Sequence, residues 1–389
     1  MRKTDKRTGI NAWVSPPPGR TWSRLLVRML WLSLFPLTLL TVEWAAANPR
    51  AVETIYSRRV YPFISQAWGF LFGWVPFSAF EILVYAALLL TAGLVVYTLV
   101  RVVAGPHRLY RLANLVVGLA LAATVLYAIF IGFWGLNYHR MPLADRLGWD
   151  ARPSSAGELA DLCEELILRA NAIRMTLPED ENGVVAPPFA TEEVLALIPA
   201  AYEKLSDTIE WMGGRYAAPK PVLASRPMCF TEITGIFSPF TLEANVNVAV
   251  PYPLLGANAA HEAAHQRGFA REDEANFIAF MACRASDDEY LTYSGLLLAA
   301  IHAMNALYGA DQDAHRTLHA LYCEGIRRDL WARSVFWDQF KGPVAETATQ
   351  INNTYLQSNK QQDGVMSYGR MVDLLLAERR MRTAGEQAD

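Results

Sequence analysis

Three stretches near the start of the chain contain no charged residue, and this limits what they can fold into. They are residues 29–42, 82–100 and 112–138. A helix of about 20 apolar residues crosses the hydrocarbon core of a bilayer, where only helices and closed barrels satisfy their own backbone groups. The first stretch reaches this length when Arg28 and Glu43 lie at the two interfaces. We therefore expect transmembrane helices at about residues 25–47, 82–100 and 112–138.

Composition supports a membrane protein and argues against a nucleic-acid partner. Hydrophobic residues make up 52% of the chain and charged residues only 19%, which is a low charge content for a soluble protein. The net charge is -3, and the part after residue 139 has no basic block, so the electrostatic footprint of a nucleic-acid-binding protein is missing. The partner that the composition indicates is a lipid bilayer.

The start of the chain is basic. Residues 1–24 are rich in arginine and lysine and are interrupted by prolines at 16–18, which predicts a disordered basic tail before the first span. Alanines at 45–47 would also fit a signal-peptide cleavage site. The long basic tail and the later spans favour an uncleaved anchor instead.

Residues 60–80 decide the topology of the membrane part. They are uncharged but contain Pro62, Pro76 and many aromatic residues, which favours an interfacial or re-entrant hairpin over a fourth span. The membrane domain would then be residues 25–138, with three spans. Because the basic tail and the arginine-rich loop 101–111 are expected in the cytoplasm, the rest of the chain would lie outside it. A fourth span would reverse that side.

The part after residue 139 shows the pattern of a mainly helical globule. We expect helices at 159–172, 191–211, 272–285, 291–308 and 371–377, the second capped by Thr191 and the fourth in a domain core rather than in the membrane. A frayed tail would follow the last one. Residues 235–250 predict one half-buried strand in which Asn245 and Asn247 alternate with apolar residues. The four cysteines form no Cys-x-x-Cys pair, so disulfides and buried thiols both remain open.

The motif that carries chemistry is His261-Glu262-Ala263-Ala264-His265. Residues four apart lie one above the other on a helix, so His261 and His265 can direct both imidazoles at one ion. This is the HExxH arrangement of zinc peptidases. Zinc lowers the pKa of a bound water from 15.7 to about 7, and Glu262 would act as the general base on that water. Gly268 can adopt the positive φ that ends the helix and turns the chain back.

A third protein ligand is needed, because a catalytic zinc site takes three protein ligands and a water. Arg271 stands where one class of zinc peptidases has a third histidine, so that class fits poorly. Glu272 and Asn276 share a helix face, and this Glu-x-x-Ala-Asn pattern resembles the second motif of gluzincin-type peptidases. The resemblance implies that Glu272 binds zinc and that Asn276 orients a liganding histidine. Glu274 is the rival ligand.

Other polar residues have less defined roles. His315 and His319 repeat the spacing of the motif without a glutamate after the first histidine, which favours a solvated helix face. The residue that stabilises the oxyanion is not identified by the sequence. The candidates are Tyr290, Tyr293, His302, Tyr355, Tyr368 and Arg370.

Several segments together resemble an uncharacterised bacterial membrane family, a domain of unknown function with N-terminal spans and an HExxH domain. They are Trp134-Gly-Leu-Asn-Tyr-His-Arg, Phe240-Thr-Leu-Glu-Ala-Asn-Val-Asn, the metal block from His261 to Phe277, and Ser367-Tyr-Gly-Arg-Met-Val-Asp-Leu-Leu-Leu. The resemblance covers most of the chain after about Trp31. It implies a bacterial source, and hence the inner membrane, and it supports a metal site without naming a substrate.

The sequence thus predicts a mainly α protein in which transmembrane helices precede a helical, gluzincin-like metallopeptidase domain, residues 139–389, with a small β-sheet edging its cleft. The expected function is zinc-dependent hydrolysis of a peptide bond in an unknown peptide or protein substrate. Two alternatives remain open. One is a membrane scaffold or sensor with a structural or relict zinc site, and the other is a zinc amidase acting on cell-wall material.

Overall fold

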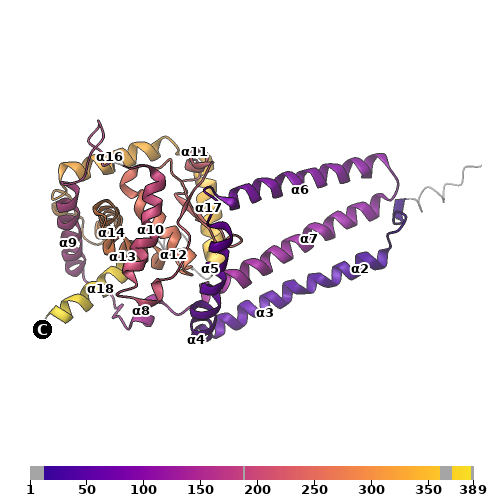
Figure 1. The fold of residues 1–389 in the computed structure, drawn as a ribbon, viewed down its shortest axis with the longest axis horizontal. Coiled ribbons are helices and arrows are strands. Elements are labelled where there is room, and N and C mark those ends of the chain that lie inside the picture. Colours follow the sequence, from indigo (N-terminus) through magenta and orange to yellow (C-terminus); the bar gives the residue numbers. More distant parts are fainter. Residues whose placement is uncertain (1–12, 187–188, 360–369, 387–389) are drawn as a thin grey trace, which may run out of the picture. The chain divides into compact units, whose positions relative to one another are not determined.

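The computed structural model describes residues 13–186, 189–359 and 370–386, and it is mainly helical with one small sheet (Figure 1). The chain divides into two compact units. The first contains the residues up to Asn48 together with Phe80–Leu136, and the second contains Pro49–Ala79 together with the residues from Asn137 onward. The second unit carries the histidine motif.

The first unit consists of the expected membrane-length helices. Trp22–Ala47 is one continuous helical segment, made of α2 (Trp22–Leu30), the 3-10 turn η1 (Trp31–Ser33) and α3 (Leu34–Ala47). It is followed by α6 (Ala79–Ala104) and α7 (Arg108–Phe133). All three are long and apolar enough to cross a membrane, and only 6% of the apolar window of α6 is buried. The expectation of three membrane-length helices is confirmed.

The third of these helices ends earlier than predicted. It stops at Phe133 rather than at Tyr138, because Trp134 leaves the helical region with a φ of -150°. Residues Gly135–His139 form the 3-10 turn η3 instead. This turn carries the chain from the first unit into the second.

The segment 49–79 includes most of residues 60–80, which do not form the predicted hairpin. It contains α4 (Pro49–Ala51), the π-helix η2 (Val52–Val60) and α5 (Tyr61–Phe72), so residues 61–72 are one helix and not a hairpin. The segment also groups with the globular part, so the predicted membrane domain 25–138 does not form one unit. The physical reason is that Tyr61 and Ser65 are buried and donate hydrogen bonds to the end of the histidine helix.

Five helices build the core of the second unit. They are α9 (Ala156–Arg174), α10 (Thr191–Leu205), α12 (Leu255–Gln266), α13 (Glu272–Ala285) and α14 (Glu289–Ala310). Helix α14 packs on α9 and α13, and α13 also packs on α12 and α10. Leu296, Leu297 and Ala300 are almost completely buried, so α14 fills the domain core, as its interrupted apolar run predicts. The helix predicted at 191–211 ends at Leu205 and is followed by the 3-10 turn η4 (Glu210–Met212), and its N-cap is Ala190 rather than Thr191.

The predicted strand 235–250 is a hairpin. Its strands are β2 (Gly235–Phe237) and β3 (Ala244–Val246), which pair antiparallel, and β1 (Lys220–Pro221) adds parallel to β3, giving the order β1-β3-β2. The chain reverses where Leu242 takes a φ of 53° and donates its N–H to Ser238. Asn245 and Asn247 are fully buried rather than solvent-facing, because their amides donate to backbone carbonyls.

Further helices, several of them as long as those of the core, complete the second unit. They are α8 (Leu143–Leu147), α11 (Ser225–Cys229), η5 (Tyr252–Leu254), α15 (Gln312–His319), α16 (Glu324–Asp338), α17 (Pro343–Ser358) and α18 (Met371–Glu386). Helix α18 continues beyond Ala377, where a frayed tail was expected, because Arg379 and Arg382 pair with Glu165 of α9. All four cysteines have free thiols, and three of them are buried.

Candidate metal centre

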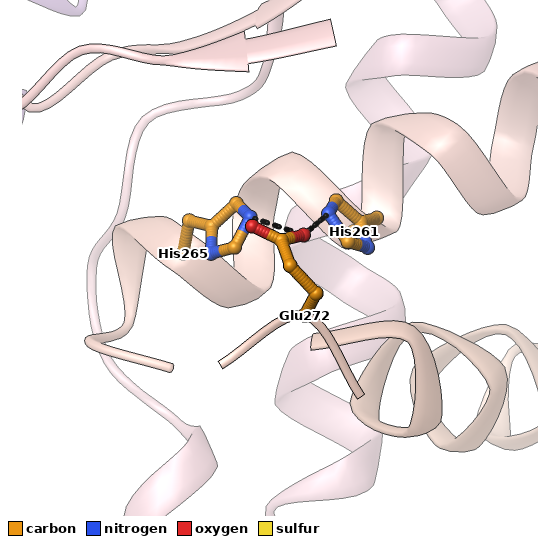
Figure 2. Close-up of side chains that lie close together, drawn as sticks. All are labelled: His261, His265 and Glu272. Carbon is orange, nitrogen blue, oxygen red and sulfur yellow. Dashed lines mark ion pairs between the residues drawn. The ribbon is translucent and has the colours of Figure 1, made fainter. Parts of the chain in front are cut away.

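The two histidines of the motif lie on one face of α12. Their ring centroids are 4.6 Å apart and the ring planes are nearly perpendicular. His265 is buried, and 13% of the His261 side chain is exposed. Figure 2 shows both rings on the side of α12 from which Glu272 approaches. The spacing of four residues therefore brings the two imidazoles together, as helical geometry requires.

The turn after α12 returns the chain toward these rings. The helix ends at Gln266, and Gly268 has a φ of 85°, which confirms the predicted glycine turn. A side chain at this position would also meet the ring of Tyr61, since an added Cβ would lie 2.9 Å from a ring carbon. Glycine is needed here both for its backbone conformation and for the close packing.

Helix α13 begins with the carboxylate that meets the histidines. Glu272 Oε2 lies 3.1 Å from His261 Nε2 and 3.5 Å from His265 Nε2 (Figure 2). One potential metal-ligand atom from each of the three residues lies within 4.8 Å of the other two. Two ligand atoms on a tetrahedral zinc, each about 2.0–2.1 Å from the ion, are about 3.3 Å apart. The separations of 3.1 and 3.5 Å are close to this value, so the three side chains are placed where they could hold a metal ion. Two imidazoles and a carboxylate are also a ligand set that zinc takes.

The rival carboxylate points elsewhere. Glu274 Oε1 accepts the backbone N–H of Leu143 at 2.7 Å and the Arg271 guanidinium at 3.3 Å. Its other oxygen accepts from Arg146 at 3.0 Å. These partners occupy both carboxylate oxygens, so the structure brings Glu272 and not Glu274 to the two histidines.

Each histidine has a second contact that fixes its ring. His261 Nδ1 lies 2.8 Å from Asn276 Oδ1, and His265 Nδ1 lies 2.6 Å from the carbonyl oxygen of Phe269. Both partners are acceptors, so each Nδ1 carries the proton and each Nε2 presents a lone pair in the neutral ring. The sequence pointed to Asn276. It gave no signal for the Phe269 carbonyl, which depends on the path of the turn.

Glu262 differs from Glu272 in its surroundings. It is only 5% exposed, and its Oε2 has no hydrogen-bond partner among the residues that the structure describes. Burial raises the pKa of Glu262 to about 7, although the two histidines oppose the shift. Strand β2 lies directly against this carboxylate, because a Cβ added at Gly235 would collide with Glu262 Oε1. Glu262 therefore has a buried oxygen near the two histidines that makes no hydrogen bond within the described residues.

The charges of the cluster favour one another. Burial disfavours the charged ring of His265, but Glu272 beside it outweighs this effect and raises the pKa of His265 to about 9. Burial likewise opposes ionisation of Glu272, and the two histidines nevertheless hold its pKa well below the usual range. An anionic carboxylate is thus stabilised next to positive charge at this point, whether the charge is a proton or a cation.

The candidate oxyanion donors differ in their contacts. The Tyr290 hydroxyl donates to the Tyr252 carbonyl, and the Tyr293 hydroxyl donates to Asp329. Both hydroxyl protons are therefore used in hydrogen bonds within the domain. Tyr355 is 41% exposed and accepts a hydrogen bond from Tyr138 at 3.0 Å. Burial, and to a smaller extent the charge of His261, lowers the pKa of His302 to about 4. Arg370 is the first residue of the last described segment, and Tyr368 lies outside the described residues. No donor is assigned from these contacts.

A second cluster of buried charges supports the turn, and sequence reasoning missed it. Arg140 donates to the Gly268 carbonyl at 2.9 Å and to both oxygens of Glu53. Arg146 lies 3.5 Å from Glu53 and 3.0 Å from Glu274. We call Glu53, Arg140, Arg146, Arg271 and Glu274 the arginine cluster. Its members come from distant segments, so no local spacing could reveal it.

Comparison with known proteins places the chain among uncharacterised sequences. The model of a family described as "Protein of unknown function (DUF3810)" matches residues 56–376. The match covers the last two membrane-length helices, the arginine cluster except Glu53, and the whole histidine–glutamate cluster. No curated protein and no solved structure matches the chain.

Proposed function

We propose that this chain, which belongs to the DUF3810 family, is a membrane-anchored, zinc-dependent metallopeptidase. The observation that carries the proposal is the convergence of His261, His265 and Glu272 beside a buried carboxylate oxygen of Glu262 that has no partner among the described residues. Three protein ligands with an adjacent acid are the composition of a catalytic zinc site, whereas a structural site closes with four ligands.

Three side chains would bind the metal. His261 and His265 would hold the metal through Nε2, with their rings fixed by Asn276 and by the Phe269 carbonyl. Glu272 would supply the third ligand oxygen. When bound, zinc would supply Lewis-acid activation of water and of the scissile carbonyl.

Glu262 would carry the proton transfers. Its Oε2 would accept a proton from the attacking water and later deliver it to the leaving amine, as a general base and then a general acid. Because this oxygen is buried and makes no hydrogen bond within the described residues, it would be ready to accept. Strand β2, which lies against Glu262, would hold that carboxylate in place.

We further propose that the protein resides in the bacterial inner membrane with its metal domain outside the cytoplasm. The support is the basic tail and the arginine-rich loop between the last two membrane-length helices, both of which the positive-inside rule assigns to the cytoplasm. Three spans then leave the second unit on the opposite side.

The experiment is turnover of a peptide library by the full-length chain in nanodiscs, loaded with zinc and compared with Glu262→Gln. We expect the wild type to cleave peptides and the substitution to lower the cleavage rate about 10²–10⁴-fold. The zinc content of the two proteins should be equal. If both proteins bind zinc and neither cleaves any peptide, the scaffold or sensor function is favoured. Release of amines from cell-wall fragments without peptide cleavage would favour the amidase.

A further inference from the structure

Helix α5 presents its apolar side outward. Phe63, Phe70 and Trp74 are 75%, 88% and 79% exposed, and Ala67 between them is exposed as well. These residues are three or four positions apart, so they share one side, which continues from the helix into Trp74 just beyond its end. A helix on the surface of a soluble domain turns its apolar side to the core. Here the apolar side faces away from it. We call these four residues the outer face of α5.

The opposite side of α5 is fixed by hydrogen bonds. The Tyr61 hydroxyl donates to the Gln266 carbonyl at 3.0 Å, and Ser65 donates to the same carbonyl at 2.8 Å. The Trp68 indole donates to the Phe240 carbonyl at 3.1 Å. A rotation of α5 that buried Phe70 would break all three bonds and leave buried carbonyls without partners, which is costly. The outward orientation of the aromatic residues is therefore built into the fold.

The position of α5 between two membrane-length helices indicates what covers its outer face. Residues 48–78 connect two membrane-length helices, one ending at Ala47 and the next beginning at Ala79. Trp74 precedes Ala79 by five positions, so even a fully extended chain allows about 18 Å between their Cα atoms. Trp74 must lie close to the level at which the chain enters the membrane.

The loop at this point is also held in place. Lys220 donates to the Phe72 carbonyl at 2.7 Å and to Glu243 at 2.6 Å, and Glu243 accepts the backbone N–H of Ala79 at 3.2 Å. These contacts, made by the buried side chains of Lys220 and Glu243, join the end of α5 to the start of the next helix. The outer face therefore cannot move far from Ala79.

The chemistry around the outer face suits a lipid headgroup region. Phe70, Trp74, Tyr216 and Arg215 line one shallow groove, and Arg215 and Arg59 are exposed. Tryptophan and tyrosine concentrate at membrane–water interfaces, and arginines beside them attract lipid phosphates. The length of α5, Tyr61–Phe72, is too short to span a bilayer.

We propose that α5 is a membrane-surface helix, with Phe63, Ala67, Phe70 and Trp74 inserted at the boundary between lipid headgroups and acyl chains. The same helix holds the carbonyl end of the histidine helix through Tyr61 and Ser65. The bilayer surface then lies about one helix diameter, roughly 10 Å, from the end of α12. This proposal does not depend on whether the metal site is catalytic.

The test uses the full-length chain in nanodiscs with one environment-sensitive fluorophore per molecule. Cys323→Ser provides the background, since the other three cysteines are buried. Labels are placed by Phe63→Cys, Phe70→Cys and Trp74→Cys. The matched controls are Met175→Cys and Trp331→Cys, because Met175 and Trp331 are 73% and 67% exposed in the same unit and neither belongs to α5.

The proposal predicts blue-shifted emission and at least twofold quenching by acyl-brominated phosphatidylcholine at 63, 70 and 74, with neither effect at 175 and 331. Equal quenching of all five labels by aqueous iodide would overturn it. A blue shift at 63, 70 and 74 that is insensitive to bromolipid and persists in detergent would mean that a second copy or another protein covers the face, and would overturn it as well.

Discussion

Two clusters of buried carboxylates lie around the α12–α13 segment, and they differ in one respect. In the arginine cluster, both oxygens of Glu53 and both oxygens of Glu274 accept from arginines or a backbone N–H. In the histidine–glutamate cluster, the carboxylate of Glu272 meets two imidazoles. There, Glu262 Oε2 has no partner among the described residues. In the arginine cluster, the buried atoms without a hydrogen-bond partner among the described residues are donors, Nε and Nη1 of Arg146, whereas in the histidine–glutamate cluster the atom is an acceptor. With respect to their carboxylate oxygens, we call the first cluster closed and the second open.

The difference follows from the partners. Arginine stays charged and offers only donors, so a carboxylate among arginines is neutralised and has no further use for a cation. A neutral imidazole offers a lone pair, so a carboxylate beside two imidazoles adds to a ligand set. Glu272 and Glu274 are two positions apart on one helix. Glu272 belongs to the open cluster because it contacts the two histidines, and Glu274 belongs to the closed cluster because it contacts Arg146 and Leu143.

The largest expected effect separates these two glutamates. Glu272→Gln should abolish stoichiometric zinc binding, because it removes the anionic ligand from the open cluster. Glu274→Gln should keep one zinc per chain, although it should lower thermal stability. Zinc content of the purified full-length variants, measured by mass spectrometry after dialysis, checks this. Loss of zinc in the Glu274 variant with retention in the Glu272 variant would reverse the comparison.

The next effect concerns the closed cluster. Glu53→Gln leaves Arg140 and Arg146 buried with less compensating charge, and breaking a buried pair in this way costs about 3–5 kcal/mol. We expect a lower unfolding temperature in detergent, and unchanged zinc content at low temperature. Arg50→Gln, at an exposed position of the same segment, is the control and should have little effect. An unchanged unfolding temperature in Glu53→Gln would show that the cluster does not stabilise the fold.

The pH dependence of stability sharpens the same point. Burial opposes ionisation of Glu53, but the hydrogen bond and charge of Arg140 outweigh it and lower the pKa of Glu53 to about 2. Since this pKa is below its unfolded value of about 4.5, the charged form stabilises the fold above pH 4.5, and the contribution disappears as the pH falls toward 2. The contribution of the ionised Glu53 to the free energy of unfolding above pH 4.5 is about 3 kcal/mol.

We therefore expect the stability gap between wild type and Glu53→Gln to be constant above about pH 5 and to shrink between pH 4.5 and 2. Thermal unfolding across this range measures the gap. A gap of the same size at pH 2.5 would show that ionisation of Glu53 is not its source.

The smallest effect concerns the contact that fixes His261. Asn276→Ala removes the acceptor of the Nδ1 proton, and the loss of such outer contacts weakens metal binding about 10–100-fold. Asn276→Asp keeps an acceptor and should retain most of the affinity. Competition with a chelator for zinc measures both. Equal affinity of Asn276→Ala and wild type would remove this residue from the site.

The parts of the site that follow local spacing could be predicted from the sequence. His261, His265 and Glu272 are separated by one helix and one glycine turn, and these have fixed geometry. The sequence favoured Glu272 over Glu274 only through the resemblance of its Glu-x-x-Ala-Asn pattern to gluzincin-type peptidases, and it did not show the physical reason for the choice. That reason depends on Leu143 and Arg146, which lie far away in the sequence.

The fold shows the same division. Long uncharged stretches identified the membrane-length helices, because their signal lies in the stretch itself. Residues 60–80 were predicted as an interfacial or re-entrant hairpin, whereas residues 61–72 form one helix in which Tyr61 is hydrogen-bonded to a carbonyl more than half the chain away. The strand 235–250 became a hairpin because Leu242 adopts a positive φ, which nothing in an apolar pattern indicates.

The central claim is that two imidazoles and one carboxylate of this chain hold a zinc ion. Zinc X-ray absorption spectroscopy of the full-length protein tests it most directly. We predict one zinc per chain, two imidazole ligands at about 2.0–2.1 Å and oxygen in the remaining positions, and no stoichiometric zinc in Glu272→Gln. A spectrum with sulfur ligands, or with fewer than two imidazoles, would contradict it.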